Sequence, residues 1–396
     1  MATATSPLGA GTTTSRRRSL AGVIPWGELD ISLIAALASI GAIGLLMVYA
    51  STRTRLTQQG LDPLFYLKRQ ATFVGLGALL MVVTTLVDYR RWRDMAAFVY
   101  AGMCGLLILV VSPLGASSKG HQAWFPIGSF QLQPSEMSKV CLILCLAAFT
   151  SWSGRGTAVD RRESLRFTKL LGLLGLAAIP MALIMLQPDL GTDLVFAAIL
   201  FAVLVVADAK GRHLIALLLV GLVGVVAVLQ LGILQRYQVD RLTAFLDPKG
   251  DTRNIGYNLN ESKITIGSGG LLGKGLFQGT QTNLSYVPEQ HTDFVFTAVG
   301  EQLGFAGSAL LLMLFAFVVW RTWHAAMQAR DAAGTLICVG VLALIVFQVF
   351  ENVGMTMGIM PIAGIPLPFV SYGGSALMAY SVAMGLVLNV NMHRFR

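Results

Sequence analysis

The residues best suited to chemistry lie at the end of a long polar stretch of the chain. Pro288-Glu289-Gln290-His291-Thr292-Asp293-Phe294 leads into an apolar segment, and Asp293 stands at its entrance beside His291. A carboxylate in that position can act as a general base toward a hydroxyl group. It can also be an acid in the first turn of a helix, where it complements the helix dipole. We therefore predict Asp293 as the catalytic residue and keep dipole capping as the alternative.

Two similar tetrads begin two other apolar segments. They are Gln133-Pro134-Ser135-Glu136 and Gln187-Pro188-Asp189-Leu190. Proline suits the first helical turn, because its missing N–H costs nothing there, and an acid after it complements the dipole. Capping is therefore one interpretation of Glu136 and Asp189. Lys139 favours a functional role for the first tetrad, because it shares a helix face with Glu136 and ionisable groups inside a membrane helix are costly.

Several basic and polar side chains complete the predicted site. Helix N-termini that face one surface favour an anion, and nearby basic side chains strengthen this preference. The sequence therefore predicts an anionic ligand, such as a lipid-linked phosphate. The predicted substrate-binding residues are Arg53, Glu136, Lys139, Asp189, Lys263, Lys274 and Ser371.

The glycine-rich stretch between these acids and the preceding apolar segment does not match a nucleotide-binding loop. It contains Gly267-Ser268-Gly269-Gly270 and Gly273-Lys274-Gly275. Ser268 stands where a Walker motif needs glycine, and Gly275 stands where Ser or Thr should bind magnesium. We expect these glycines to allow tight turns or a close approach of the backbone to a substrate.

Membrane-spanning helices must position these residues. The chain of 396 residues is 55% hydrophobic and 12% charged, whereas soluble domains carry about 25% charged residues. Apolar runs of roughly 17–25 residues, long enough to cross about 30 Å of hydrocarbon, recur along it. We predict an all-α polytopic membrane protein with about ten transmembrane helices. The predicted spans are 30–50, 71–87, 95–112, 136–151, 169–186, 190–207, 213–233, 303–320, 334–358 and 373–390.

The basic residues predict the orientation of these spans. With a cytoplasmic N-terminus, the inner segments hold 17 of the 29 Lys and Arg residues, as the positive-inside rule requires. The net charge of +9 therefore reflects topology and contact with membrane lipid, and no nucleic-acid partner is expected. We predict that 1–28 is a disordered cytoplasmic tail. Residues 29–396 then form one membrane domain with both termini inside and a long outer loop, about 234–302, between spans seven and eight.

With these motifs, the chain resembles the SEDS family of polytopic peptidoglycan glycosyltransferases. The resemblance runs from about Asp30 to the C-terminus. Phe245-Leu246-Asp247-Pro248 and Gly279-Thr280-Gln281 are more similar to the elongation member, RodA, than to the division member, FtsW. The matching stretches are Gly44 to Arg53, the two tetrads, Gly267 to Gly275, Pro288 to Phe296, Gly300 to Gly304 and Gly364 to Ser375.

The resemblance implies a reaction, a partner and a set of site residues. The reaction is polymerisation of lipid II into β-1,4 glycan strands at the outer face of the bacterial cytoplasmic membrane. It implies inversion at the donor's anomeric carbon, undecaprenyl diphosphate as leaving group, and a class B penicillin-binding protein transpeptidase as partner. The essential acid of the family's His-Thr-Asp-Phe motif corresponds to Asp293, the tetrad residues to Glu136, Lys139 and Asp189, and the arginine after the first span to Arg53.

Three features leave alternatives open. The chain departs from the family at His121-Gln122-Ala123, at Glu261 and at Asp193, which bears on the second outer loop and the charge balance. A divalent cation, Mg or Mn, could stabilise the leaving diphosphate. Acids and a lysine among many spans also fit a flippase that carries a lipid-linked precursor. Against that alternative, the polar groups are predicted to cluster at one face instead of the midplane, and no inverted repeat is evident.

Overall fold

The computed structural model describes most of the chain as one bundle of helices. It describes residues 28–113, 115–118, 121–127, 130–152, 165–230, 238–239, 241, 245 and 255–394. The predicted tail, 1–28, lies outside these residues except for Glu28, so its character stays a prediction. The helices are α1 (Ile31–Gln58), α2 (Phe65–Leu86), α3 (Tyr89–Asp94), α4 (Ala96–Val111), α5 (Pro134–Trp152), α6 (Phe167–Met185), α7 (Leu190–Val206), α8 (Gly211–Gln230), α10 (Ile255–Ser268), α11 (Thr280–Asn283), α12 (Val295–Gln328), α13 (Ala332–Met357) and α14 (Gly374–Met392).

Each predicted span overlaps one helix. In chain order these are α1, α2, α4, α5, α6, α7, α8, α12, α13 and α14. Among the described residues, six helices are long and apolar enough to cross a membrane, namely α1, α2, α6, α12, α13 and α14. Three further apolar helices are shorter: α4, α7 and the Gly211–Gly224 part of α8. The prediction of an all-α polytopic membrane protein is therefore confirmed.

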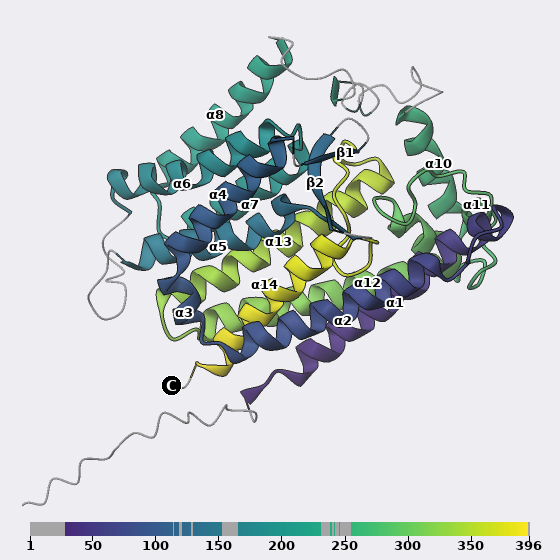
Figure 1. Cartoon of the computed structure of the whole chain (residues 1–396), viewed down its shortest axis with the longest axis horizontal. Coiled ribbons are helices and arrows are strands. Elements are labelled where there is room, and N and C mark those ends of the chain that lie inside the picture. Colours follow the sequence, from purple (N-terminus) through teal and green to yellow (C-terminus); the bar gives the residue numbers. More distant parts are fainter. Residues whose placement is uncertain are drawn as a thin grey trace, which may run out of the picture.

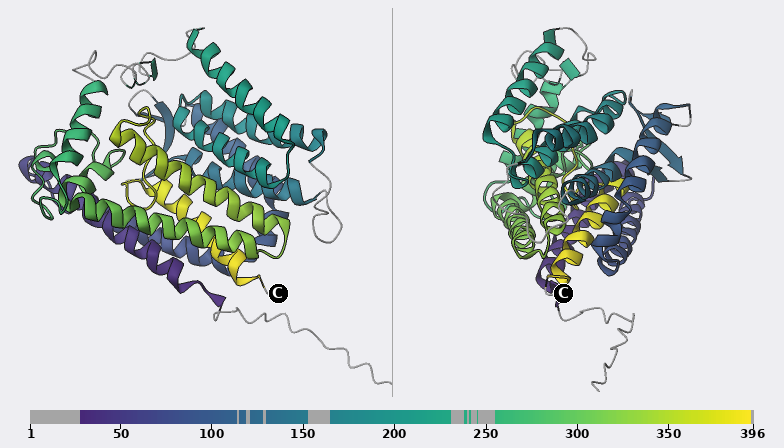
Figure 2. Two further views of the ribbon diagram at one scale, coloured as in Figure 1. Left: turned by 180° about the vertical axis from the view of Figure 1, so that it is seen from behind. Right: turned by 90° about the vertical axis from the view of Figure 1, so that its left-hand side faces the viewer.

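The C-terminal helices form the centre of the bundle. α13 and α14 run through its middle, and α2, α5, α7 and α12 pack around them (Figure 1). In an apolar stretch of 18 residues of α14, 89% of the residues are buried inside the bundle, whereas in the corresponding stretch of α12 22% are buried. α8 lies at the edge and points away from the bundle (Figure 2). Because α8 and α12 expose apolar side chains, these helices meet lipid over much of their surface.

A small antiparallel sheet interrupts the helices between α4 and α5. Its strands are β1 (Ala116–Ser118), β2 (His121–Ile127) and β3 (Phe130–Leu132), in the order β1-β2-β3. β2 pairs with β1 through Ala116 and Trp124, and with β3 through Phe125 and Leu132. The sequence analysis predicted helices and loops only and missed this sheet, because each of its outer strands is three residues long.

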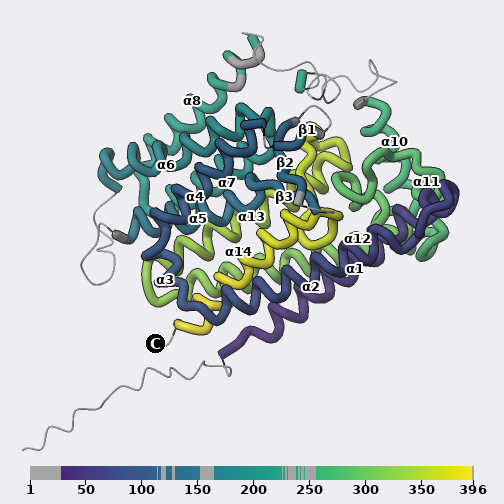
Figure 3. The backbone as a smooth tube through the Cα atoms, viewed as in Figure 1, coloured from purple at the N-terminus to yellow at the C-terminus, as the bar shows by residue number. Residues whose placement is uncertain are grey.

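The end of the bundle that carries α10 and α11 is called the loop end below (Figure 3). There α12 begins at Val295, ahead of the predicted start at 303, and is kinked at Gly304, whose φ is 65° and ψ is −163°. A kink frees backbone amides, which need new acceptors. Here the amides of Phe305 and Ala306 donate to the carbonyl groups of Gly270 and Leu271, at 2.9 and 3.0 Å.

The glycine-rich stretch therefore interlocks with the first turns of α12. The amides of Lys274 and Gly275 donate to the carbonyl groups of Glu301 and Gln302, at 2.9 and 3.1 Å. A Cβ on Gly273 would lie 2.2 Å from the Gln302 carbonyl oxygen, and the φ of Gly273 is +80°. The glycines thus allow tight turns, as predicted, and their close approach is to the chain's own backbone.

Candidate active site

The extended segment Ala363-Gly364-Ile365, called the 363–365 segment below, connects α13 to α14 at the loop end. Asn352, near the end of α13, donates from its Nδ2 to the carbonyl oxygen of Ile365 at 2.7 Å. The same Nδ2 donates to the carbonyl oxygen of Asp293 at 2.8 Å. One buried amide therefore fixes the backbone of Asp293 against this segment.

The carboxylate of Asp293 and the guanidinium of Arg241 both border Gly364. A Cβ on Gly364 would lie 3.5 Å from Nη1 of Arg241 and 3.6 Å from Oδ2 of Asp293. Arg241 also donates from Nη1 to the carbonyl oxygen of Ala363 at 3.1 Å. The acid and the cation thus lie within 4 Å of the same Cβ position, so a side chain at 364 would enter the space beside both groups.

The two tetrads meet beside the same segment. Asp189 caps α7, because its Oδ1 accepts from the amide of Thr192 at 3.0 Å and its Oδ2 from the Thr192 hydroxyl at 2.8 Å. Gln133 of the other tetrad donates from Nε2 to Oδ2 of Asp189 at 3.4 Å. A Cβ on Gly191 would lie 2.9 Å from the Ala363 carbonyl oxygen. Capping thus accounts for the conformation of Asp189, which lies at the start of a helix that packs against the 363–365 segment.

The pair formed by Glu136 and Lys139 lies inside the bundle. Nζ of Lys139 donates to Oε1 of Glu136 at 2.7 Å, and the two residues are 1% and 4% exposed. Among the described residues, Oε2 of Glu136 and the hydroxyl of Tyr380 on α14 find no hydrogen-bond partner. The lysine charge is therefore neutralised within the protein, and a further polar group could still be bound by the carboxylate.

The three other predicted basic residues, Lys274, Arg53 and Lys263, make contacts within the loop end. Lys274 donates from Nζ to Oε1 of Glu301 at 2.8 Å, and Glu301 is fully buried. Arg53 donates from Nη2 to the carbonyl oxygen of Phe277 at 3.2 Å and lies over its ring, 4.5 Å from the centroid. The Lys263 side chain crosses Gly358, so that its Nζ would lie 2.6 Å from a Cβ there.

Ser371 has a defined structural contact as well. Its hydroxyl accepts from the amide of Leu367 at 2.9 Å, and its carbonyl oxygen accepts from Nε2 of Gln70 at 3.1 Å. It therefore holds the turn before α14. Whether Ser371 or the basic residues also contact substrate stays a prediction.

The structure brings Asp293 and Asp189 to the same 363–365 segment, beside two residues that the prediction did not include. Asn352 had a signal in the sequence, since a polar residue stands late in an apolar span. Arg241 had none, because it is one of six basic residues in the long loop and its spacing does not distinguish it. Only the folded 363–365 segment identifies it.

Comparison with known proteins agrees with this architecture. Residues 30–396 match the model of the cell cycle protein family of FtsW, RodA and SpoVE. The chain belongs to this SEDS family. Stage V sporulation protein E of Bacillus subtilis is 36% identical over 365 residues, covering 92% of this chain and 97% of that protein. Peptidoglycan glycosyltransferase MrdB of Escherichia coli is 35% identical over 329 residues, covering 83% and 86%.

Solved structures of SEDS proteins share the fold. A chain from a structure described as structural coordination of polymerization and crosslinking by a peptidoglycan synthase complex has a TM-score of 0.77 and 32% identity, covering 94% of this chain and 100% of that one. The crystal structure of the rod shape determining protein RodA of Thermus thermophilus has a TM-score of 0.67 and 30% identity, covering 94% and 99%. The RodA and MrdB matches support the predicted RodA-like character, although relatives named FtsW and SpoVE are also close.

Proposed function

We propose that this SEDS protein is a peptidoglycan glycosyltransferase that polymerises lipid II into β-1,4 glycan strands. Family membership over 30–396 and the relatives named as peptidoglycan glycosyltransferases support this activity. The single observation that carries it is that the Asp293 carboxylate and the Arg241 guanidinium both border Gly364. This is an acid–cation pair suited to joining a hydroxyl nucleophile to a diphosphate-linked sugar.

The proposed reaction is one in-line displacement. The donor sugar is α-linked to diphosphate and the product is β-linked, so a single inversion suffices. The acceptor hydroxyl attacks the anomeric carbon, the bond to the diphosphate oxygen breaks, and Asp293 takes the hydroxyl proton. The diphosphate leaves with its negative charge, which Arg241 stabilises beside Gly364. Arg53 and Lys139 remain proposed contributors to substrate binding.

Replacement of Asp293 tests the assignment. Asp293→Asn keeps the size of the side chain and removes its basicity, so polymerisation of purified lipid II is expected to fall by about 10²–10⁴-fold. Asp94→Asn, an exposed carboxylate beside Arg93, serves as the matched control and keeps the native rate. An Asp293→Asn protein that melts like the native chain and polymerises at the native rate overturns the assignment.

A flippase is the second candidate, and the buried Glu136–Lys139 pair is the observation that favours it. Transporters place such groups among their spans. Sealed liposomes separate the two activities. Glycan formed from lipid II by the purified chain alone supports the polymerase, whereas transfer of intact lipid II across the bilayer without polymer supports the flippase.

A divalent cation, Mg²⁺ or Mn²⁺, is part of the proposal. Magnesium is commonly held by one or two carboxylates together with substrate phosphates. Among the described residues no group of three or more His, Cys, Asp or Glu side chains could hold an ion, and we propose such a shared site, with Asp293 or Asp189 as the protein ligand. The cation would offset the diphosphate charge. Loss of activity in EDTA and recovery with Mg²⁺ is the expected result, and an unchanged rate removes the cation from the proposal.

We also propose the cellular setting. The similar structure described as a peptidoglycan synthase complex supports a class B penicillin-binding protein transpeptidase as partner of this chain. The membrane is the bacterial cytoplasmic membrane, with both termini inside. Co-purification with the transpeptidase encoded in the same organism tests the partnership, and its absence under conditions that keep the chain active contradicts it.

A further inference from the structure

A cavity of about 430 Å³ lies beside the turn that carries Asp293. It is bounded on one side by the end of α1 and the start of α2, and on the other by 285 and 287–291. Pockets that bind small ligands measure about 300–1,000 Å³. The cavity is thus large enough for one or two sugar rings, and Asp293 itself does not line it.

Aromatic rings form one wall of this cavity. Tyr66, in the first turn of α2, and His291 both line it, with ring centroids 4.9 Å apart. Tyr372 lies behind them, 5.1 Å from Tyr66 and 5.6 Å from His291. Its amide donates to the His291 carbonyl oxygen at 2.9 Å. The rings are therefore held in place before any ligand arrives, which reduces the entropy lost on binding.

The remaining lining combines apolar side chains with polar and charged ones. Arg55, Asp62 and Glu289 line the cavity together with amide and hydroxyl groups. The hydrogen bonds from Lys68 and from the amide of Leu64 lower the pKa of Asp62, so it is an ionised acceptor at neutral pH. A sugar ring combines an apolar C–H face with a rim of hydroxyl and acetamido groups. Aromatic rings facing carboxylates and a guanidinium match that combination.

Two strained residues shape the same wall. Ser285 and Glu289 both have a positive φ, 56° and 52°, and both line the cavity. Such conformations cost about 1–3 kcal/mol each in residues other than glycine and tend to persist at binding sites. Their retention here agrees with a wall shaped for a ligand.

The turn links this cavity to the catalytic acid. The amides of Thr292 and Asp293 both donate to the Glu289 carbonyl oxygen, at 3.1 and 3.2 Å. Within this turn His291 lines the cavity, while the Asp293 carboxylate borders Gly364. A ligand in the cavity therefore contacts the turn through His291, whereas a ligand beside Gly364 contacts it through Asp293.

We propose that this cavity is a subsite for the N-acetylated sugar of the acceptor, with Tyr66 and His291 as its stacking residues. The inference rests on the proposed glycosyltransferase function and names the part of the site that the acceptor occupies. The diphosphate of the donor lies at Arg241 and the sugar of the acceptor at Tyr66, and the turn that carries His291 and Asp293 contacts both.

Binding of a soluble sugar tests the subsite without requiring turnover. The full-length chain in lipid nanodiscs is titrated with the tetramer of N-acetylglucosamine, and binding is followed by saturation-transfer NMR and calorimetry. Tyr66→Ala is expected to weaken binding at least tenfold and Tyr66→Phe to restore it, because the ring is retained. Tyr286→Ala is the matched control, since Tyr286 is exposed on the same loop and does not line the cavity.

Two further variants keep the test decisive. Gln59→Trp places a large side chain at an exposed position of the cavity rim and is expected to abolish tetramer binding even if Tyr66→Ala fails to fold. Asp293→Asn is expected to bind the tetramer like the native chain. Two results would overturn the subsite. One is no binding by the native chain at 10 mM tetramer, roughly the limit for so weak a site. The other is equal binding by the native and Gln59→Trp proteins. If the native chain does not polymerise lipid II, that result instead overturns the proposed function.

Discussion

Lys139 is a charged group that the protein has removed from both water and lipid. Its Nζ lies 2.7 Å from Oε1 of Glu136, and both residues are nearly inaccessible. Two ions in a medium of low dielectric constant are stable only as a pair, because a single buried ion loses its solvation without compensation. The pair therefore constrains α5 whatever its part in the reaction.

Single and double replacements of this pair separate stability from activity. Glu136→Gln or Lys139→Met leaves one group unpaired and is expected to lower the free energy of unfolding by about 3–5 kcal/mol. The double variant Glu136→Leu/Lys139→Met is expected to recover most of that loss. Thermal melts in detergent measure the first effect and lipid II polymerisation the second. Full activity in the stable double variant would contradict the predicted substrate-binding role.

Residue types and spacing predicted part of the site. Asp293 and Asp189 follow from acids at the start of apolar spans, because a helix N-terminus is recognisable in sequence. Arg241 could not be predicted, since its relation to Asp293 is created by the fold of the 363–365 segment. For Lys274 the charge was evident from the residue type, but its partner was not: Glu301 binds it only because the glycine-rich stretch folds onto α12.

At the scale of elements, the apolar pattern was sufficient to predict a helix at each of the ten predicted positions, because long apolar runs are recognisable in the sequence. It was insufficient where the chain is polar. The kink at Gly304 and the start of α12 at Val295 depend on backbone contacts with Gly270 and Leu271, which no local pattern reports. The sheet of β1, β2 and β3 was missed for the same reason.

The interlock between the glycine-rich stretch and α12 predicts unequal effects for two glycines of the same motif region. Gly273→Ala introduces a Cβ 2.2 Å from the Gln302 carbonyl oxygen at a φ of +80°, and is expected to destabilise the chain by about 1–3 kcal/mol from strain alone. Gly267→Ala, with no atom within 4 Å of the new Cβ, lies in α10 and should be neutral or slightly stabilising. Thermal melts compare them. Equal melting temperatures for the two variants would contradict the interlock.

The opposite end of the bundle joins α1 to α12 through a carboxylate. Asp30 caps α1, accepting from the amide of Leu33 at 3.1 Å, and its Oδ2 accepts from Nε of Arg321 at 2.7 Å. Burial raises the pKa of Asp30, but hydrogen bonds from Ser32, the Leu33 amide and Arg321 together lower it below its usual value of 3.8. The folded form thus holds the ionised carboxylate more favourably than the unfolded form does.

The sign of the resulting pH dependence follows from linkage. A lowered pKa in the folded state gives stability that is fully present above the unfolded pKa, about 3.9, and is lost as the pH falls through the folded value. Asp30→Asn is therefore expected to lower the melting temperature at pH 7 and to differ progressively less from the native chain below about pH 4. Melts between pH 3 and pH 7 measure this difference, and Asp94→Asn is the exposed control. A difference that grows toward low pH would contradict the predicted direction.

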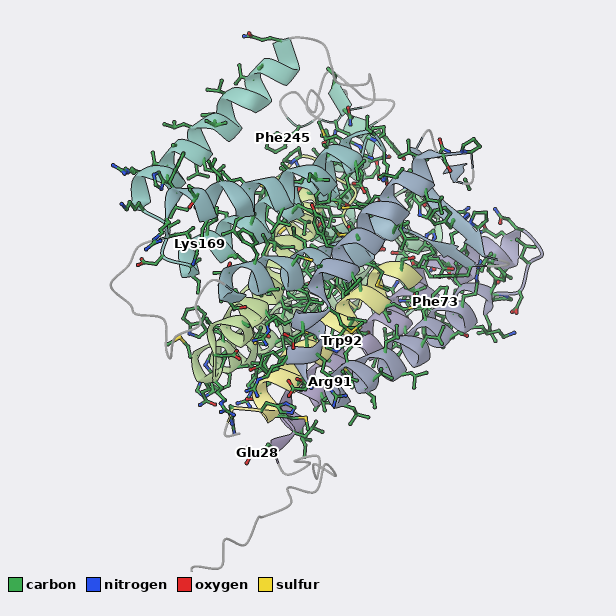
Figure 4. All side chains as sticks on the ribbon, turned by 60° about the vertical axis from the view of Figure 1, so that its left-hand side comes forward. Glu28, Phe73, Arg91, Trp92, Lys169 and Phe245 are labelled. Atoms are coloured by element: carbon green, nitrogen blue, oxygen red, sulfur yellow. The ribbon has the colours of Figure 1, made fainter. Side chains whose placement is uncertain are left out.

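At the scale of the whole molecule, charge divides the bundle into two ends. Besides Asp30 and Arg321, the end that carries α3 and the C-terminus contains the ion pairs Arg90–Asp331 and Arg394–Glu28. Figure 4 shows Glu28, Arg91 and Lys169 on one side of the bundle and Phe73 toward the other. The loop end contains the turn that carries Asp293, the 363–365 segment and the cavity lined by Tyr66 and His291. The end that carries α3 and the C-terminus is called the basic end below. If it is cytoplasmic, the reaction takes place at the outer surface.

Accessibility labelling tests this orientation directly. Gln278→Cys adds a thiol at an exposed position of the loop end, and Arg91→Cys adds one at an exposed position of the basic end. Because 17 of the 29 basic residues lie on the predicted inner side, the positive-inside rule expects a membrane-impermeant maleimide to label Gln278→Cys in intact cells and Arg91→Cys only after permeabilisation. The native chain is the control, since its four cysteines are buried or half-buried. Labelling of Arg91→Cys alone in intact cells would place Asp293 in the cytoplasm, where a base for joining sugars at the outer surface could not act.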